Sequence, residues 1–504
     1  MAQTSSPLIE FSKISKTFGA VAANRDVTFS VHSSTIHGVV GENGAGKSTI
    51  MKILYGMFEP DHGVISLKGK PTPIRTPQEA ISLGIGMVHQ HFMLVPTLTV
   101  WENIILGKEP SLWFVDEASV MGQLENLKKE FGFQVELNQK VETLSVGHQQ
   151  QVELLKLLFR KSDILILDEP TAVLSPQEVE SLFERLKNLK KAGKTIILIT
   201  HKLKEILNHT DCVTIMRQGT VVETLATRDL SEEILAEKMI GHKRSPLKRH
   251  EEAHTPQAKL QVSSLTLKKP MGQKLSDISF EVNAGEIVGI AGIEGNGQQE
   301  LIKCLAGIER HFDGQIVFNN QNILDVDSYD LKQMGFSIIP PDRHREAVIL
   351  PFSISENAIL GHHKEREIRN GWFLSGSKTE PIVSHMIQRF DVRPKDPHLS
   401  MVSLSGGNQQ KLVVARETSR PVQFLLAAHP TRGIDIGAID FIHQHFLELK
   451  SKGTGILLIS SELDEILKLS DRILVLFHGR IVAQFTKETA NERELGLSMT
   501  GGTV

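Results

Sequence analysis

The sequence repeats itself, and this repeat constrains the fold more than any other feature of the 504 residues. Residues 38–61, GVVGENGAGKSTIMKILYGMFEPD, align with residues 289–312, GIAGIEGNGQQELIKCLAGIERHF, with their glycines in register. Further matched blocks follow in the same order in both halves: TVWENIILG with SISENAILG, LSVGHQQQVELLK with LSGGNQQKLVVAR, and TIILITHKLKEIL with TGILLISSELDEIL. Chance similarity does not preserve the order of several blocks, so the chain is a tandem duplication.

The duplication predicts two domains, at residues 1–242 and 259–504, joined by a linker at residues 243–258. The sequence around this linker, GHKRSPLKRHEEAHTPQ, is polar, charged and interrupted by prolines, which is typical of a short exposed connection. Within each half, apolar runs of strand length alternate with longer helical patterns. This alternation favours an α/β fold built on a buried, largely parallel sheet.

The composition is that of an ordinary globular protein and excludes some function classes. The net charge is −3, whereas a nucleic-acid-binding domain is usually basic. The two cysteines, Cys212 and Cys304, lie apart from each other in apolar contexts, so we expect buried, reduced thiols. No apolar run approaches the roughly 20 residues that cross a bilayer, so any role at a membrane is exercised from its side.

A glycine-rich loop in the first half has the pattern of a phosphate-binding loop. Its sequence GENGAGKS fits G-x-x-x-x-G-K-[ST], follows an apolar strand and opens a helical segment. Backbone N–H groups of such a loop, with the helix N-terminus, face the phosphates, while the lysine neutralises their charge and the serine hydroxyl binds Mg²⁺. A bare motif can also occur without function. The predicted nucleotide-binding residues here are Gly41, Glu42, Asn43, Gly44, Ala45, Gly46, Lys47, Ser48 and Thr49.

Two adjacent carboxylates, Asp168 and Glu169, end the apolar run ILILDEP. Burying two carboxylates is costly unless they serve an ion or a proton. Asp168 suits the Mg²⁺ shell, and Glu169 suits the base that activates an attacking water. Alternatively, the pair marks an exposed strand end, and His201, after the run TIILIT, is a structural histidine. The joint presence of the loop, the carboxylates and the repeat favours the catalytic interpretation.

At these motifs the chain resembles the ATP-binding subunits of ABC transporters over essentially its whole length. The resemblance implies two tandem P-loop NTPase domains, each a largely parallel sheet with a helical subdomain, paired head to tail as an intramolecular pseudo-dimer. Each ATP would lie between the P-loop of one domain and the signature segment and D-loop of the other. By position, Gln90 would contact Mg²⁺ and water, and His201 would sense the γ-phosphate. Phe18 would stack on adenine, although it could equally be a core residue.

Departures from the family pattern gather in one of the two implied sites. The complete site would combine Lys47, Ser48, Gln90, Asp168, Glu169 and His201 with the signature residues Ser405, Gly406, Gly407 and Asn408 and the D-loop residue Asp435. The other site carries Gln298, Gln299, Glu300, Ala428, His429, Ser461 and, near the glutamine position, Pro341, opposite Val146, His148 and Ser175. Since loss of a general base alone costs about 10²–10⁴ in rate, we expect negligible hydrolysis there. The second loop would then be retained for its shape.

The degenerate second half, with its segments PPDRHREAVI and HPTRGIDIGA, looks like the simple-sugar importer ATPases, and most like their nucleoside-uptake branch. This resemblance implies Mg²⁺-dependent ATP hydrolysis coupled to uptake of nucleosides or simple sugars. The implied partners are two transmembrane permease subunits, docking near His91–Trp101 and Arg343–Phe352, and an extracytoplasmic substrate-binding protein. The chain would lie peripherally on the cytoplasmic face of the inner membrane, touching neither the cargo nor nucleic acid.

Two other functions remain open from the sequence. Some tandem ABC proteins act on ribosomes as translation factors, but they carry two intact sites and a long charged linker. A regulatory nucleotide-binding module without turnover is the other alternative, and the intact pair Asp168 and Glu169 disfavours it.

Overall fold

The chain divides into two compact units, Met1–Ser245 and Pro246–Val504. A computed structural model describes residues 7–19, 21–42, 44–89, 92–108, 116–171, 174, 176–240, 257–269, 272–293, 295–324 and 326–501. The predicted linker lies almost entirely outside these residues, so its limits stay a prediction.

The first unit is built on a six-stranded sheet in the order β10-β9-β3-β8-β7-β6, beside a four-stranded sheet in the order β2-β1-β4-β5. In the larger sheet β6, β7, β8, β3 and β9 run parallel and β10 closes one edge antiparallel. The strands of this unit are β1 (Ile9–Phe18), β2 (Val21–Val31), β3 (Ile36–Gly41), β4 (His62–Leu67), β5 (Lys70–Pro71), β6 (Ile85–Val88), β7 (Ile164–Asp168), β8 (Thr195–Ile199), β9 (Cys212–Arg217) and β10 (Thr220–Ala226). Its helices are α1 (Lys47–Leu54), α2 (Pro77–Ser82), α3 (Val100–Ile105), α4 (Glu117–Phe131), α5 (Val146–Phe159), α6 (Pro176–Lys191), α7 (Leu203–His209) and α8 (Glu232–Ile240).

The second unit repeats this topology, with a six-stranded sheet β16-β19-β20-β13-β21-β22 and a four-stranded sheet β12-β11-β14-β15. Its strands are β11 (Ala258–Lys269), β12 (Gly272–Asn283), β13 (Ile287–Ala291), β14 (Asp313–Phe318), β15 (Gln321–Asn322), β16 (Phe336–Ile339), β17 (Arg369–Asn370), β18 (Phe373–Leu374), β19 (Phe424–Ala428), β20 (Gly455–Ser460), β21 (Arg472–Phe477) and β22 (Arg480–Thr486). Its helices are α9 (Gln298–Leu305), α10 (Ser328–Gln333), α11 (Ile354–Ala358), α12 (Gly376–Arg389), α13 (Gly406–Thr418), α14 (Ile436–Ser451), α15 (Leu463–Leu469) and α16 (Glu492–Met499). The predicted α/β fold with a largely parallel central sheet is therefore confirmed in both halves.

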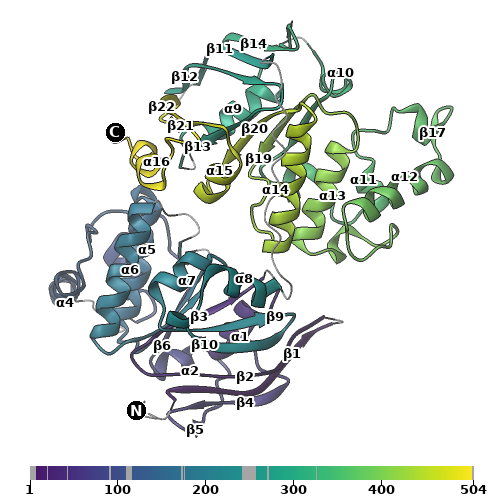
Figure 1. Ribbon diagram of the computed structural model, residues 1–504. Helices are drawn as coiled ribbons and strands as arrows, with labels where there is room; N and C mark the ends of the chain where they lie inside the picture. Colours follow the sequence, from purple (N-terminus) through teal and green to yellow (C-terminus); the bar gives the residue numbers. More distant parts are fainter. Residues whose placement is uncertain are drawn as a thin grey trace. The chain divides into compact units, whose positions relative to one another are not determined.

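Side chains that point alternately to the two faces of the buried parallel strands explain why the central sheet is covered on both sides. In β7, Ile164 and Ile166 belong to a core shared with the antiparallel sheet and α1, whereas Leu165 and Leu167 belong to a core shared with α3–α6. Because successive side chains of a strand point to opposite faces, a continuous apolar run is what a sheet covered on both faces requires. Figure 1 shows this arrangement within the first unit, with β1, β2 and β4 on one side and α4–α6 on the other.

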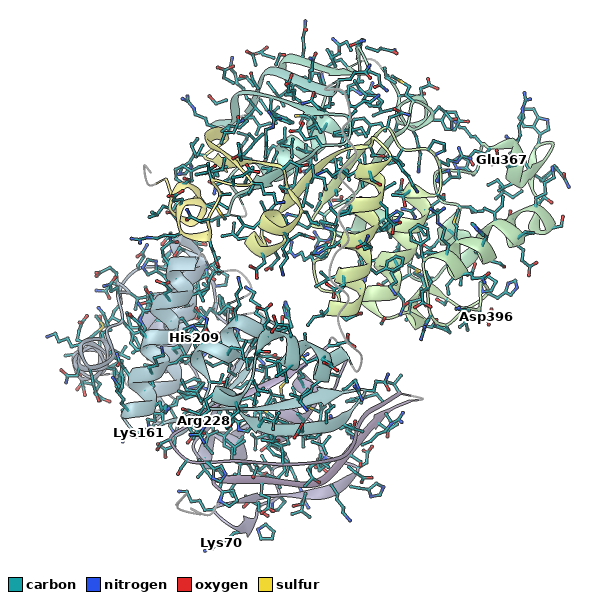
Figure 2. All side chains as sticks on the ribbon, viewed as in Figure 1. Lys70, Lys161, His209, Arg228, Glu367 and Asp396 are labelled. Atoms are coloured by element: carbon teal, nitrogen blue, oxygen red, sulfur yellow. The ribbon has the colours of Figure 1, made fainter. Side chains whose placement is uncertain are left out.

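The helical layer of the second unit extends away from its sheet. In Figure 1, α12, α13 and the short hairpin β17–β18 lie in this layer. Figure 2 labels Glu367 beside the hairpin and Asp396 beyond the other end of α12. None of the helices in the described part of either unit combines the length and apolarity needed to cross a membrane.

A packing detail common to both units shows how closely the halves match. Asn103 donates through its amide nitrogen to the Val95 carbonyl and accepts from the Val95 N–H, at 3.0 and 2.7 Å. Asn357 makes the same pair of bonds with Ile349, at 3.0 and 2.8 Å. Both asparagines are fully buried, so each fixes the loop that precedes its helix.

In each unit the parallel strands of the central sheet end on the same side, and the site residues lie at these carboxyl ends.

Candidate nucleotide site

The glycine-rich loop of the first unit follows the buried central strand β3 and leads into α1, as predicted. Gly44 and Gly46 have φ values of 84° and 92°, in the left-handed region that favours glycine. A Cβ on Gly46 would lie 2.3 Å from the Ala23 carbonyl oxygen, so the backbone at this point also leaves no room for a side chain. This close packing holds the loop backbone and the first turn of α1 at the carboxyl end of β3.

Lys47 is the first residue of α1 and is only 5% exposed. Its Nζ donates hydrogen bonds to the carbonyl oxygens of Gly41, at 2.7 Å, and Glu42, at 2.9 Å. Burial lowers the pKa of the ammonium, opposed by the carboxylates of Glu169 and Asp168. The Lys47 ammonium is thus held against its own loop, in a position to contact an anion bound there.

Ser48 and Asp168 lie together at the carboxyl end of β7. The Ser48 hydroxyl donates to Asp168 Oδ1 at 3.3 Å. Burial raises the pKa of Asp168, with the hydrogen bond from Ser48 working in the opposite direction. Neighbouring oxygen ligands of an octahedral Mg²⁺ lie about 3 Å apart, so this pair of hard oxygen donors fits two positions of such a shell.

The described residues contain no group of three or more acidic, histidine or cysteine side chains that could hold a metal by themselves. A magnesium ion at Ser48 and Asp168 would therefore need further oxygen ligands from a phosphate chain and water. This is the usual way in which Mg²⁺ binds at phosphoryl-transfer sites.

Glu169 and His201 form a pair next to Asp168. Glu169 Oε1 lies 3.0 Å from His201 Nδ1. Burial alone would raise the pKa of Glu169, but the hydrogen bond and charge of His201, with the nearby lysines 47 and 202, hold the pKa below its ordinary value. The carboxylate is therefore ionised at neutral pH, the state that a general base needs.

The backbone at Glu169 is shaped to present the carboxylate. Its φ is 47°, and its N–H donates to the Ile199 carbonyl at 2.9 Å. His429 of the second unit has a φ of 45°, and its N–H donates to the Ile459 carbonyl at 2.7 Å. Since a non-glycine residue rarely adopts this conformation, the second half has kept the special backbone while replacing the acid.

The structure describes only some of the remaining predicted residues of the first unit. Gln90 and Asn43 lie outside the residues that the structure describes, as does Ser175. Thr49 is in the first turn of α1, and the Ala45 N–H donates to the Glu42 carbonyl at 3.0 Å. Phe18 ends β1 with 43% exposure and packs edge-on against Phe58 at 5.1 Å between ring centres. It is thus not a core residue, and its contact with adenine stays a prediction.

The signature segment of the second unit forms the turn that begins α13. Ser405 caps this helix because its Oγ accepts from the Asn408 N–H, and the same Oγ also accepts from Asn408 Nδ2 at 2.9 Å. A Cβ on Gly407 would lie 2.2 Å from Asp435 Oδ2. Asp435 itself caps α14 through the Ala438 N–H at 2.7 Å. The structure thus brings the predicted signature and D-loop residues of this unit together.

The phosphate loop of the second unit keeps its form without its charge. Gln298 is 5% exposed and donates through Nε2 to the Ile293 carbonyl at 2.9 Å, the counterpart of the bond from Lys47 to Glu42. Its Oε1 is buried without a hydrogen-bond partner. Gly297 retains a left-handed φ of 110°. The loop is therefore built in the same way, but it offers an amide where the first unit offers an ammonium.

Sequence reasoning missed Glu205, which supports the Glu169–His201 pair. This buried carboxylate accepts from the Thr171 hydroxyl at 2.5 Å and from the Thr200 hydroxyl at 2.9 Å. It therefore joins the segment after Glu169 to the segment before His201. A glutamate one helical turn after the histidine was the available indication. Arg343, also missed as a site residue, lies against the signature turn of the second unit.

We expect Glu205→Ala to destabilise the first unit by about 1–3 kcal/mol, because two buried hydroxyl groups lose their acceptor. The urea unfolding midpoint of the full chain measures the loss, and ATP turnover should fall with it. Glu237→Ala, at an exposed glutamate of α8, serves as the control. An unchanged midpoint in Glu205→Ala would contradict the supporting role.

Comparison with known proteins agrees with this geometry. The family model described as ABC transporter matches residues 24–172 and 275–432. The chain is 41% identical to the nucleoside import ATP-binding protein NupA of Lactococcus lactis subsp. cremoris, over 99% of each chain. It is 43% identical to the guanosine import ATP-binding protein NupO of Bacillus subtilis, over 98% of each.

One solved structure resembles nearly the whole chain. It is the archaeal ribosome recycling factor aABCE1 in complex with the stalk protein aP1, with a TM-score of 0.61 at 18% identity. The likeness covers 94% of this chain and 90% of that one. At this identity it shows a shared fold and carries no information on function.

Proposed function

This chain belongs to the ABC transporter family, and on that premise we propose that it is the ATP-hydrolysing subunit of an importer for nucleosides. The observation that carries the proposal is the pairing of Glu169 with His201, beside Ser48 and Asp168 at the carboxyl ends of the parallel strands. The names of two relatives above 40% identity, a nucleoside and a guanosine importer, favour nucleosides over simple sugars as the cargo class.

We propose that the working site combines the phosphate loop of the first unit with the signature turn of the second. The first side would supply Lys47, Ser48, Gln90, Asp168, Glu169 and His201, and the second Ser405, Gly406, Gly407, Asn408 and Asp435. Support comes from the assembly of each side within its own unit. Phe18 and the loop residues Gly41 to Thr49 complete the proposed nucleotide contacts.

The chemistry follows from the groups present. Lys47 would exchange its loop carbonyls for the β- and γ-phosphate oxygens, and Ser48 and Asp168 would hold Mg²⁺, which would supply positive charge to offset that of the phosphates. Glu169 accepts the proton of the water that attacks the γ-phosphate in line. His201 orients that carboxylate through Nδ1 and would face the γ-phosphate. The chain is thus an ATPase whose rate enhancement comes mainly from charged groups that are held in place before the reaction.

The site formed by the second phosphate loop is proposed to be inert. It has Gln298 for the lysine, Ala428 for the metal-binding aspartate and His429 for the glutamate, so it lacks the ammonium, the carboxylate metal ligand and the carboxylate base of the first site. We expect each chain to hydrolyse one ATP in its first turnover. Rapid quench with excess nucleotide measures this number as the amount of ATP hydrolysed per chain in that turnover. Two ATP hydrolysed per chain would contradict the one-site proposal.

Family membership implies membrane permeases as partners. We propose two permease subunits, docked near His91–Trp101 and Arg343–Phe352, and an extracytoplasmic substrate-binding protein that selects the cargo. Closure of the two units around ATP would push on the permeases from the cytoplasmic face of the inner membrane, and hydrolysis would release them. Closure energy must come from a higher affinity of ATP for the closed state.

Cargo and rival function are tested together. With the binding protein present, a nucleoside should stimulate the ATPase activity of the assembled transporter, and ribose or galactose should not. Stimulation by a sugar but not by a nucleoside would show that the cargo is a sugar. Cell fractionation distinguishes a translation factor, since sedimentation with ribosomes, independent of co-expressed permeases, would contradict the transport proposal.

A further inference from the structure

The Arg343 guanidinium joins two functional segments of the second unit. Its Nη1 donates to the Arg432 carbonyl at 2.9 Å and its Nη2 to the Gly433 carbonyl at 3.4 Å, within the D-loop. A Cβ on Gly406 would lie only 2.6 Å from Nη2. The guanidinium therefore lies against the backbone of the signature turn while it is hydrogen-bonded to the D-loop.

The segment that carries Arg343 is itself fixed. The Asp342 carboxylate accepts from the backbone N–H of His344 at 3.0 Å, capping the short helical turn Arg343–Ala347. His344 Nε2 lies 2.9 Å from Gln409 Oε1. Gln409 uses its amide nitrogen to donate to the Leu404 carbonyl at 3.2 Å, so its oxygen is the acceptor for His344. Both flanks of Arg343 are thus tied down, one of them to α13 directly after the signature turn.

The first half provides an internal comparison. Val146 matches Gly406 and is 40% exposed, so a side chain is accommodated at this position of the first unit. The segment from Val88 to Val100 matches that from Ile339 to Ile354 but is three residues shorter and contains no arginine. The longer segment with its arginine therefore occurs in the half with the intact signature LSGGN, and is absent from the half with the degenerate one.

We propose that Arg343 is a positioning residue for ATP hydrolysis, which holds the signature turn Ser405–Asn408 and the D-loop as one rigid group. The guanidinium occupies the space that a Cβ on Gly406 would need, as the Asp435 carboxylate does at Gly407. The role rests on the proposed function, since the signature turn acts on a nucleotide held by the first unit. Arg343 is also the first residue of the proposed docking surface, so on this proposal a shift of that surface would be passed to the turn.

The test compares Arg343→Ala and Arg343→Lys in the full-length chain. We expect kcat to fall about 10- to 100-fold in the alanine variant, since a misplacement of about 1 Å can cost about 100-fold in rate. Binding of ADP without Mg²⁺, which reports the phosphate loop alone, should be unchanged. The lysine variant should recover little of the lost kcat, because an ammonium cannot replace a planar guanidinium that bonds two carbonyls at once. Arg310→Ala is the matched control, since the guanidinium of this exposed arginine also bonds a backbone carbonyl, that of Gly307.

Millimolar guanidinium ion should partly restore turnover in Arg343→Ala and leave Lys47→Ala inactive. A fall in turnover that guanidinium does not restore and that follows a lowered melting temperature would show a merely structural arginine, overturning the inference. Wild-type kcat and KM in Arg343→Ala would overturn it as well. Neither result touches the proposed function, which fails instead if turnover persists without Glu169.

Discussion

Replacing Glu169 with glutamine should reduce steady-state ATP turnover by a factor of at least about 10²–10⁴, the usual contribution of a general base. Glutamine is nearly isosteric with glutamate and can still bond His201, so the site keeps its shape but loses the group that takes the proton from water. ATP affinity should remain close to that of the wild type, because Lys47 and Ser48 are untouched. Phosphate release and fluorescent-nucleotide titration measure the two quantities separately.

The second half supplies the matched control for this substitution. His429 occupies the same special backbone position as Glu169, with a φ of 45° against 47°. His429→Gln should leave turnover unchanged, because the site to which it belongs lacks the lysine and the metal ligands. Equal losses in the two variants, or steady turnover by Glu169→Gln, would remove the basis for a single working site.

The overall fold was predictable because the same information occurs twice. The repeat, the alternation of apolar strands with helical segments and the order of the motifs were enough to predict two α/β domains. Both units have the same order of strands in their central sheets. The Lys47 loop and the acidic pair after β7 were also predictable, since a short motif and a strand end place each of them.

Other parts of the site could not be predicted because they depend on long-range packing. Arg343 contacts Arg432 and Gly433, which lie about ninety residues away in the sequence and belong to a different motif. A single sequence shows that the segment is longer in the second half but not where its arginine points. Glu205 was missed for a related reason: its partners Thr171 and Thr200 follow two different strands.

The retention of a charge-free phosphate loop has a physical explanation in the same packing. A Cβ on Gly292 would lie 2.5 Å from Gln298 Nε2, and the amide of Gln298 bonds the loop carbonyl of Ile293. The glutamine therefore fills the space of a lysine held over its loop and keeps the loop closed without a cation. We propose that the second loop is retained for this fixed shape and not for nucleotide turnover.

Lys47→Ala should lower turnover by about 10²–10³ or more, the usual cost of removing one preorganised donor from developing charge, and should weaken ATP binding as well. Gln298→Ala, the equivalent truncation in the second loop, should retain most of the activity. Gln298→Lys should restore a lysine without creating a second active site, because Ala428 and His429 still replace the metal ligand and the base. Single-turnover stoichiometry would therefore stay at one ATP per chain in Gln298→Lys, and a rise to two would mean that the missing lysine alone had silenced the second site.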